Sequence, residues 1–167
     1  MITLKPLSVD AVPAALAKAE RYRLLNEPEQ AESICEDVLA ADPGNREALV
    51  MLLLSVTDQF PSHEGALVAR AQSLVERLDG EYERAYYTGL VAERRARALV
   101  GHGGPGATLS AGDWLRDAMR HFERAEAIRP AGNDDARLRW NACARLVMRH
   151  PHLGAPAGDE YQPLMLE

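Results

Sequence analysis

Apolar and polar positions along the chain follow the three- and four-residue spacing of amphipathic helices. This spacing predicts seven helices between Asp10 and Arg149, at about residues 10–25, 28–41, 46–59, 63–78, 81–100, 111–128 and 133–149. The segment 46–59 is strongly apolar and is expected to be the most buried helix. No segment alternates between apolar and polar residues as a half-buried strand would. The expected fold class is therefore all-α.

Proline and glycine separate these predicted helices, because proline pushes the residue before it out of helical geometry and glycine permits tight turns. The breaks fall at 26–28, 42–45, 60–62, 79–80 and 130–132. Asp10 is a candidate N-cap for the first helix, which tolerates Pro13 in its first turn. Ser110 and Asp113 form a weakened capping box after a glycine-rich loop at 101–112. We therefore expect a helix to begin at each of these two caps.

A short motif of small and large residues occurs twice, 87 residues apart. The first copy is Ala31-x3-Cys35-x2-Val38-x4-Pro43, and the second is Ala118-x3-Phe122-x2-Ala125-x4-Pro130. Each copy lies on a predicted helix that follows another helix and ends at a proline. A fixed pattern that recurs across helix pairs indicates a helical repeat array, in which each pair stacks on the next.

These helix pairs resemble the tetratricopeptide repeat, a unit of about 34 residues with small residues at fixed positions. The first unit matches through Ala19, Tyr22 and Ala31, and it closes in Asp-Pro-Gly-Asn at 42–45. The second unit is degenerate and lacks the proline; its matching residues are Leu49, Leu52, Leu53, Val56 and Ala66. The third unit adds Gly89 and Ala92 to the second motif copy. The resemblance covers about residues 12–149.

Several positions depart from the family pattern. Ala15, Lys18 and Cys35 occupy the positions of the family's Trp, Leu and Phe, and about a dozen extra residues separate the helices of the third unit. The resemblance implies an α-solenoid of about three helix hairpins with a C-terminal capping helix at 133–149. It also implies binding of a protein or peptide, with no chemistry of its own.

In such arrays the first helix of each pair lines a concave groove. The resemblance places there Leu16, Glu20, Arg23, Val50, Leu54, Thr57, Tyr86, Leu90, Arg94, Arg137, Asn141 and Arg145. Apolar residues at one end and guanidinium and amide donors at the other suit a peptide with apolar anchors and an acidic end. Arg137 and Asn141 resemble the pair with which some tetratricopeptide domains hold a chaperone's terminal carboxylate. A solvated face on the last helix is the competing interpretation.

Composition agrees with close helix packing, since 47% of the 167 residues are hydrophobic but only 5% are Phe, Trp or Tyr. No apolar run approaches the roughly 20 residues of a membrane span. The first ten residues also lack the apolar region of a secretion signal, so Cys35 and Cys143 are expected to be reduced, buried thiols in a cytoplasmic protein. We expect an arm at 1–9, one repeat domain at 10–150 and a tail at 151–167.

The net charge of −6 is unevenly distributed along the chain. Residues 1–83 carry −8, residues 84–150 carry +5 and residues 151–167 carry −3. The acidic half argues against a nucleic-acid partner, because it would repel phosphates. The tail is acidic and apolar, as the predicted groove requires of a ligand. It is therefore either a disordered terminus or a segment that lies in the groove of its own or a second copy.

No motif indicates catalysis or a cofactor. Gly101 to Thr108 has the spacing of a phosphate-binding loop, but Ala107 replaces the lysine and no strand precedes it. The histidines lack carboxylate or thiol neighbours at the spacing of a metal site. The sequence therefore predicts a non-catalytic adaptor or chaperone without metal or cofactor. Two alternatives remain open: an accessory or regulatory subunit of an enzyme, and a module that self-associates through its tail.

Overall fold

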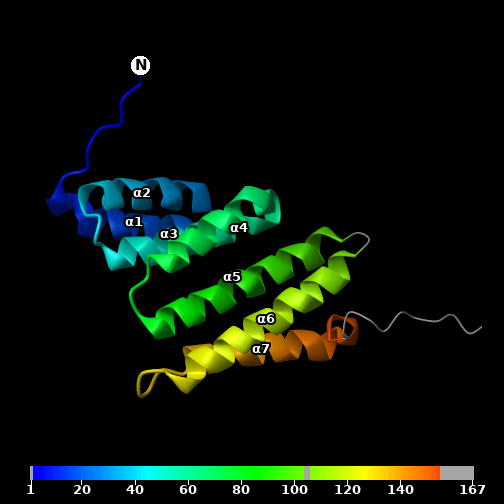
Figure 1. Ribbon diagram of the computed structural model, residues 1–167. Coiled ribbons are helices and arrows are strands. Elements are labelled where there is room, and N and C mark those ends of the chain that lie inside the picture. Colours follow the sequence, from blue (N-terminus) through cyan, green and yellow to red (C-terminus); the bar gives the residue numbers. More distant parts are fainter. Residues whose placement is uncertain (1, 104–105, 155–167) are drawn as a thin grey trace, which may run out of the picture. The chain divides into compact units, whose positions relative to one another are not determined.

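The computed structural model describes residues 2–103 and 106–154, which form seven α-helices and two short 3-10 helices (Figure 1). No strand occurs in these two ranges, so the predicted all-α class is confirmed. The chain divides after Arg84 into two compact units, which we call unit 1 (Met1–Arg84) and unit 2 (Ala85–Glu167). Each unit is described separately below.

Unit 1 contains a 3-10 helix, η1 (Val9–Ala11), followed by α1 (Val12–Leu24), α2 (Pro28–Ala41), α3 (Arg46–Asp58) and α4 (Phe60–Glu76). Helix α1 packs against α2, α2 against α3, and α3 against α4. Prolines occupy the first turn of α1, α2 and α4, where the missing N–H would have no partner inside the helix. Asn45 caps α3, because its side-chain oxygen accepts a 2.9 Å hydrogen bond from the backbone N–H of Ala48.

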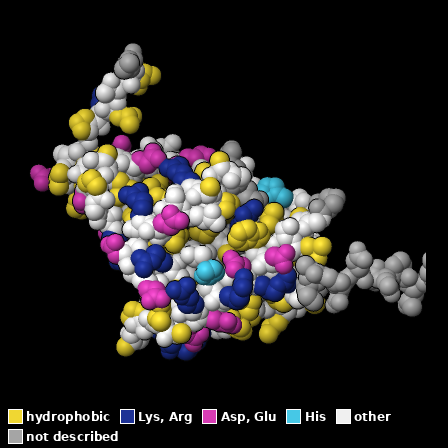
Figure 2. All heavy atoms as spheres, viewed as in Figure 1, with side chains coloured by type: hydrophobic (Ala, Val, Ile, Leu, Met, Phe, Trp, Pro, Cys, Tyr) yellow, Lys and Arg dark blue, Asp and Glu magenta, His cyan; other side chains and the backbone are white. Residues whose placement is uncertain are grey.

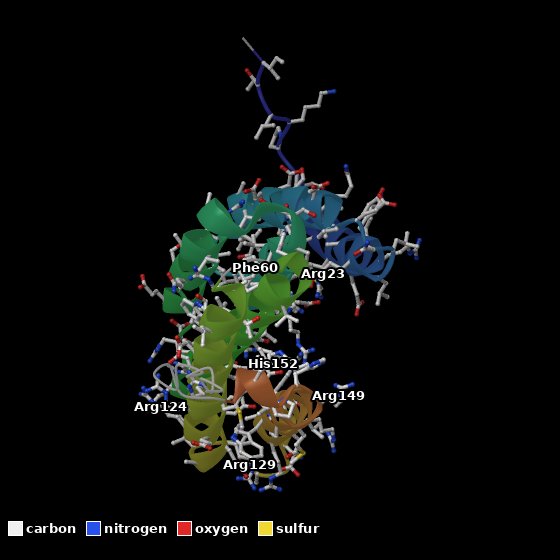
Figure 3. The ribbon with its side chains drawn as sticks, turned by 90° about the vertical axis from the view of Figure 1, so that its right-hand side faces the viewer. Arg23, Phe60, Arg124, Arg129, Arg149 and His152 are labelled. Atoms are coloured by element: carbon white, nitrogen blue, oxygen red, sulfur yellow. The ribbon has the colours of Figure 1, made fainter. Side chains whose placement is uncertain are left out.

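The interior of unit 1 is mostly apolar; its buried polar residues are the uncharged Ser55, Thr57 and Gln59. Phe60, Leu53 and Cys35 are fully buried, and Figure 3 shows Phe60 among the helices of this unit. Ala19 and Ala31 also have no exposed surface. These alanines occupy the small-residue positions of the motif, so the helices that carry them can approach their neighbours closely.

Unit 2 contains α5 (Glu81–His102, from Ala85 onward), α6 (Ala107–Ala127), α7 (Asp135–Arg149) and a 3-10 helix, η2 (Pro151–Leu153). Helix α6 packs against α7, and η2 packs against both. Gly89 permits α5 to approach α6, because a methyl group there would lie 2.8 Å from the ring of Phe122. Figure 3 shows Arg129 at the turn between α6 and α7, and Arg149 and His152 at the opposite end of α7.

Three helix starts differ from the sequence predictions. Pro61 does not lie in the break between α3 and α4, since α4 begins at Phe60 and contains the proline in its first turn. Asp10 lies within η1 and does not cap α1 through its side chain. Helix α6 begins at Ala107, so Ser110 lies inside the helix instead of capping it. Helices α4 and α6 therefore begin earlier than predicted, and the residue expected to cap α1 lies in a 3-10 turn before that helix.

The glycine-rich insertion is shorter than expected. Helix α5 extends to His102 and α6 begins at Ala107, so most of the predicted extra residues are helical. The tail also differs from the prediction at its start, because residues 151–153 form η2 and Leu153 is buried. The proposed groove-binding part of the tail, residues 155–167, lies outside the described residues.

The repeat pattern agrees with burial at most of its positions. Ala118, Phe122 and Ala125 are fully buried on α6. Ala66 is exposed, and Ala71 is the buried alanine of α4 instead, so the proposed alignment of the second unit was wrong at this position. The stacking of all hairpins into a solenoid stays a prediction.

Candidate functional site

A hollow in the surface of unit 2 is the strongest candidate for a functional site. It has a volume of about 370 Å³ and is lined by Tyr86 of α5 and by Asp135, Leu138, Arg139 and Ala142 of α7. The four α7 residues follow the spacing i, i+3, i+4 and i+7, which places them on one strip of the helix. We call these five residues the α5–α7 hollow.

A buried carboxylate lies behind this hollow. Glu93 of α5 is only 1% exposed, although an uncompensated carboxylate would cost several kcal/mol to bury. Arg97, one helical turn later, donates a 2.9 Å hydrogen bond to Glu93 Oε1. Arg139 reaches Glu93 Oε2 from α7 at 3.5 Å. We call these three residues the Glu93 cluster; it joins α5 to α7 and carries one more positive than negative charge.

The Arg139 guanidinium is therefore held from two sides. Burial alone would lower the pKa of Arg139, but its hydrogen bond with Tyr86 and the charge of Glu93 outweigh this effect and raise the pKa above its usual value. The ring of Tyr86 is itself positioned by Phe122, whose centroid lies 5.8 Å away. The result is a permanently charged, oriented guanidinium at the wall of a hollow that also holds one carboxylate, Asp135, beside the apolar surface of Tyr86, Leu138 and Ala142.

The six groove residues predicted in unit 1 divide into buried and accessible positions. Leu16 and Thr57 are buried, and the Thr57 hydroxyl donates to the carbonyl oxygens of Leu53 and Leu54 at 3.0 Å, so these two residues do not line an accessible surface. Arg23 bridges α1 to α3 through a 2.8 Å hydrogen bond from its Nε to Asp58. The remaining three are Glu20, which is exposed, and Val50 and Leu54, which are half-buried.

The six groove residues predicted in unit 2 are not brought together. Leu90 is buried and Arg94 is half-buried on α5, so of this helix only Tyr86 lines the hollow. Arg137 pairs with Glu126 at 2.7 Å and with Asp134 at 3.3 Å. The remaining two are Asn141, which is half-buried, and Arg145, which is exposed.

The α7 residues predicted for the groove and those that line the hollow lie on different faces of the helix. Arg137, Asn141 and Arg145 lie on the side away from the buried residues Ala136 and Cys143. The strip that borders the hollow begins at Asp135 instead. A signal for the face that borders the hollow was present in the sequence, because Glu93 interrupts a small and apolar helix face and is followed four residues later by Arg97.

Comparison of the chain with protein-family models, curated proteins and solved structures finds no match. Functional inference therefore rests on the residues themselves, and the tetratricopeptide resemblance enters only as a proposal. Among the side chains that the structure describes (residues 2–62, 65–103 and 106–154), no three of His, Cys, Asp or Glu are grouped as a metal site would require. No helix in these ranges is both long enough and apolar enough to span a membrane.

Proposed function

We propose that this chain is a non-catalytic protein- or peptide-binding module, acting as an adaptor or chaperone, and that its partner binds in the α5–α7 hollow. The observation that supports the proposal best is the placement of Arg139. Its side chain is 37% exposed at the hollow, yet it is oriented from behind by Glu93 and Tyr86. A guanidinium that is already ordered loses less conformational entropy when it binds a ligand.

The residues around Arg139 define the chemistry of the ligand. Tyr86, Leu138 and Ala142 offer apolar surface to an aliphatic or aromatic side chain. Arg139 offers N–H donors to a carboxylate. Asp135 offsets the extra positive charge of the Glu93 cluster elsewhere in the hollow, so we expect the anion to bind at Arg139 itself. The expected ligand is therefore a peptide segment in which an apolar side chain lies within a few residues of an acidic one.

Selection from a random peptide library displayed on phage, against the full chain, tests this ligand class. We expect enriched peptides to combine an apolar residue with Asp, Glu or a free C-terminal carboxylate. Binding of a selected synthetic peptide is then measured by calorimetry for Leu138→Asp and for a matched control, Met148→Asp. Both side chains are exposed on α7, but only Leu138 lines the hollow.

We expect the two variants to differ in their affinity for the peptide. Leu138→Asp places a negative charge beside the carboxylate site and removes an apolar contact, so affinity should fall at least about tenfold. Met148→Asp should bind as the unchanged chain does. Equal affinity of all three proteins would contradict the proposal, and a loss confined to Met148→Asp would place the ligand on the outer face of α7 instead.

A further inference from the structure

The N-terminal arm carries apolar side chains that no part of unit 1 covers. Residues 2–8 precede η1 without forming a helix, and Figure 1 shows this segment leading away from α1 and α2. Ile2 is 98% exposed and Leu4 is 84% exposed. Figure 2 shows hydrophobic side chains of the arm standing clear of the helices. Large exposed aliphatic groups next to each other favour a binding partner over solvent.

Unit 1 also has an unfilled apolar hollow close to the base of this arm. It has a volume of about 290 Å³ and is lined by Leu7, Ala11, Ala14, Ala15 and Lys18, together with Ile34 and Asp37 of α2. Ala11 of η1 and the α1 residues follow one strip, and three of these four residues are alanines. Their small side chains leave the space that larger aliphatic groups would fill. We call this set the α1–α2 hollow.

We propose that the arm of one copy of this chain docks in the α1–α2 hollow of a second copy, and that the exchange is reciprocal. In an extended segment Ile2 and Leu4 point to the same side, so both can enter one hollow. Lys5 alternates to the other side of such a segment, so its charge can stay in water while Ile2 and Leu4 are buried. Each copy then supplies one arm and one hollow, which is the arrangement of a twofold-symmetric dimer.

The chain's own arm fits its own hollow poorly. Leu7 already lines that hollow, so Leu4 could enter it only if the chain reversed direction between these two residues. Pro6 opposes such a reversal, because its ring fixes its own backbone angle and keeps Lys5 extended. The arm is therefore directed outward, toward a second molecule.

Sedimentation equilibrium of the full chain, over a range of concentrations, tests the proposal with two matched pairs of variants. On the arm, Leu4→Asp is compared with Leu24→Asp, which alters a leucine of similar exposure (82%) outside the hollow. On the hollow, Ala14→Arg is compared with Ala17→Arg, another exposed alanine of α1 that does not line it. All four sites are exposed, so each variant should retain its helical circular dichroism signal.

We expect the unchanged chain to form dimers, and Leu4→Asp and Ala14→Arg each to raise the dimer dissociation constant at least about tenfold. The two control variants should dimerise normally. A 1:1 mixture of Leu4→Asp and Ala14→Arg should recover part of the dimer, because one intact arm meets one intact hollow. A monomer at every concentration would overturn the proposal, as would dimers that Leu4→Asp does not weaken.

Cross-linking distinguishes exchange between copies from docking within one copy. Leu4→Cys and Ala14→Cys chains are mixed under mild oxidation; the native Cys35 and Cys143 are buried and should not react. A disulfide-linked dimer containing one chain of each type supports the exchange. A cross-link that forms only when both substitutions are in the same chain, and yields a monomer, would show that the arm folds onto its own hollow and would contradict the proposal.

Discussion

The two units accommodate their charged residues differently. In unit 1 the interior is apolar around Phe60, and ion pairs such as Arg23 with Asp58 lie at its half-buried edge. In unit 2 a carboxylate, Glu93, lies in the interior itself, with Arg97 and Arg139 reaching it from the surface. An apolar interior needs only complementary shapes, whereas a buried charge also needs its partners in place.

This difference links stability to function in unit 2. The same Arg139 that neutralises Glu93 also borders the α5–α7 hollow, so the binding surface we propose is fixed by the interior of the unit. Unit 1 has no equivalent constraint on its α1–α2 hollow, because the two charged residues that line it, Lys18 and Asp37, are not buried. Substitutions at charged residues should therefore affect the two units very unequally.

The largest expected effect comes from removing both cationic partners of Glu93. The double variant Arg97→Gln/Arg139→Gln leaves a carboxylate that is 1% exposed without a counter-charge. Its unit 2 should lose about 3–5 kcal/mol of unfolding free energy. Urea unfolding followed by tryptophan fluorescence measures this loss directly, because Trp114 and Trp140, the chain's two tryptophans, both belong to unit 2.

A third substitution provides the control for this variant. Adding Glu93→Leu replaces the unpaired buried carboxylate by an apolar side chain of similar size. Replacing a buried ion pair by apolar residues is often neutral or stabilising. The triple variant should therefore regain most of the lost stability. Failure to recover would mean that the two arginines act through their own packing, not through the buried charge.

The next largest effect is expected at the close approach of α5 and α6. Gly89→Val would push a branched side chain into the ring of Phe122, where even a methyl group would lie 2.8 Å away. Overpacking of this kind costs about 1–3 kcal/mol. Tryptophan fluorescence in urea should show an earlier transition for this variant.

A second helical glycine supplies the contrast in unit 1. Gly65 of α4 has no atom within 4 Å of the position that a methyl group would take. Gly65→Ala should therefore stabilise unit 1 by about 0.5–1 kcal/mol, through the better helix propensity of alanine. The rate at which Cys35 is labelled in urea, followed by mass spectrometry, reports on unit 1. A destabilising Gly65→Ala would show that unit 1 is packed as tightly as unit 2.

Local periodicity was sufficient to predict the helices. The apolar spacing placed all seven, and the burial of Ala19, Ala31 and Ala118 followed from the repeat motif. Their ends were predicted less well, because proline is acceptable both after a helix and within its first turn. The sequence around Pro61 fits both, and the apolar contacts of Phe60 favour the earlier start of α4.

The α7 face that borders the hollow could not be fixed from the sequence of α7 alone. Arg137, Arg139 and Arg145 are chemically equivalent, and which one points inward depends on how α7 is rotated against its neighbours. That rotation brings Arg139 to Glu93, 46 positions earlier in the chain. Two residues so far apart in the sequence leave no local pattern that reveals their pairing. The one signal in the sequence was a glutamate, Glu93, on a helix face of otherwise small and apolar residues.

The two buried thiols allow the pH dependence of each unit to be compared. Burial raises the pKa of Cys35 and of Cys143 from 9.0 to about 12. Above pH 9 the unfolded state releases a proton that the folded state keeps, so stability is fully present below pH 9 and falls between pH 9 and 12. The slope is about 1.4 kcal/mol per pH unit for each thiol.

Removing one thiol at a time isolates its contribution. Urea midpoints of unit 2, measured by tryptophan fluorescence between pH 9 and 10.5, should fall less steeply in Cys143→Ala than in the unchanged chain. Cys35→Ala is the matched control and should leave the slope of unit 2 unaltered, since Cys35 lies in unit 1. Identical slopes in all three proteins would mean that the Cys143 thiol is not shielded from ionisation in the folded state.

The smallest effect is expected at the ion pair of unit 1. Arg23→Gln removes the 2.8 Å contact with Asp58, but both side chains reach water, so the Asp58 carboxylate can still be solvated. The loss in unit 1 should be no more than about 1 kcal/mol, and it should shrink further in 1 M salt. Cys35 labelling in urea measures it. If Arg23→Gln cost as much as Arg97→Gln/Arg139→Gln, burial of the carboxylate would not be what separates the two units, and the special role assigned to the Glu93 cluster would be lost.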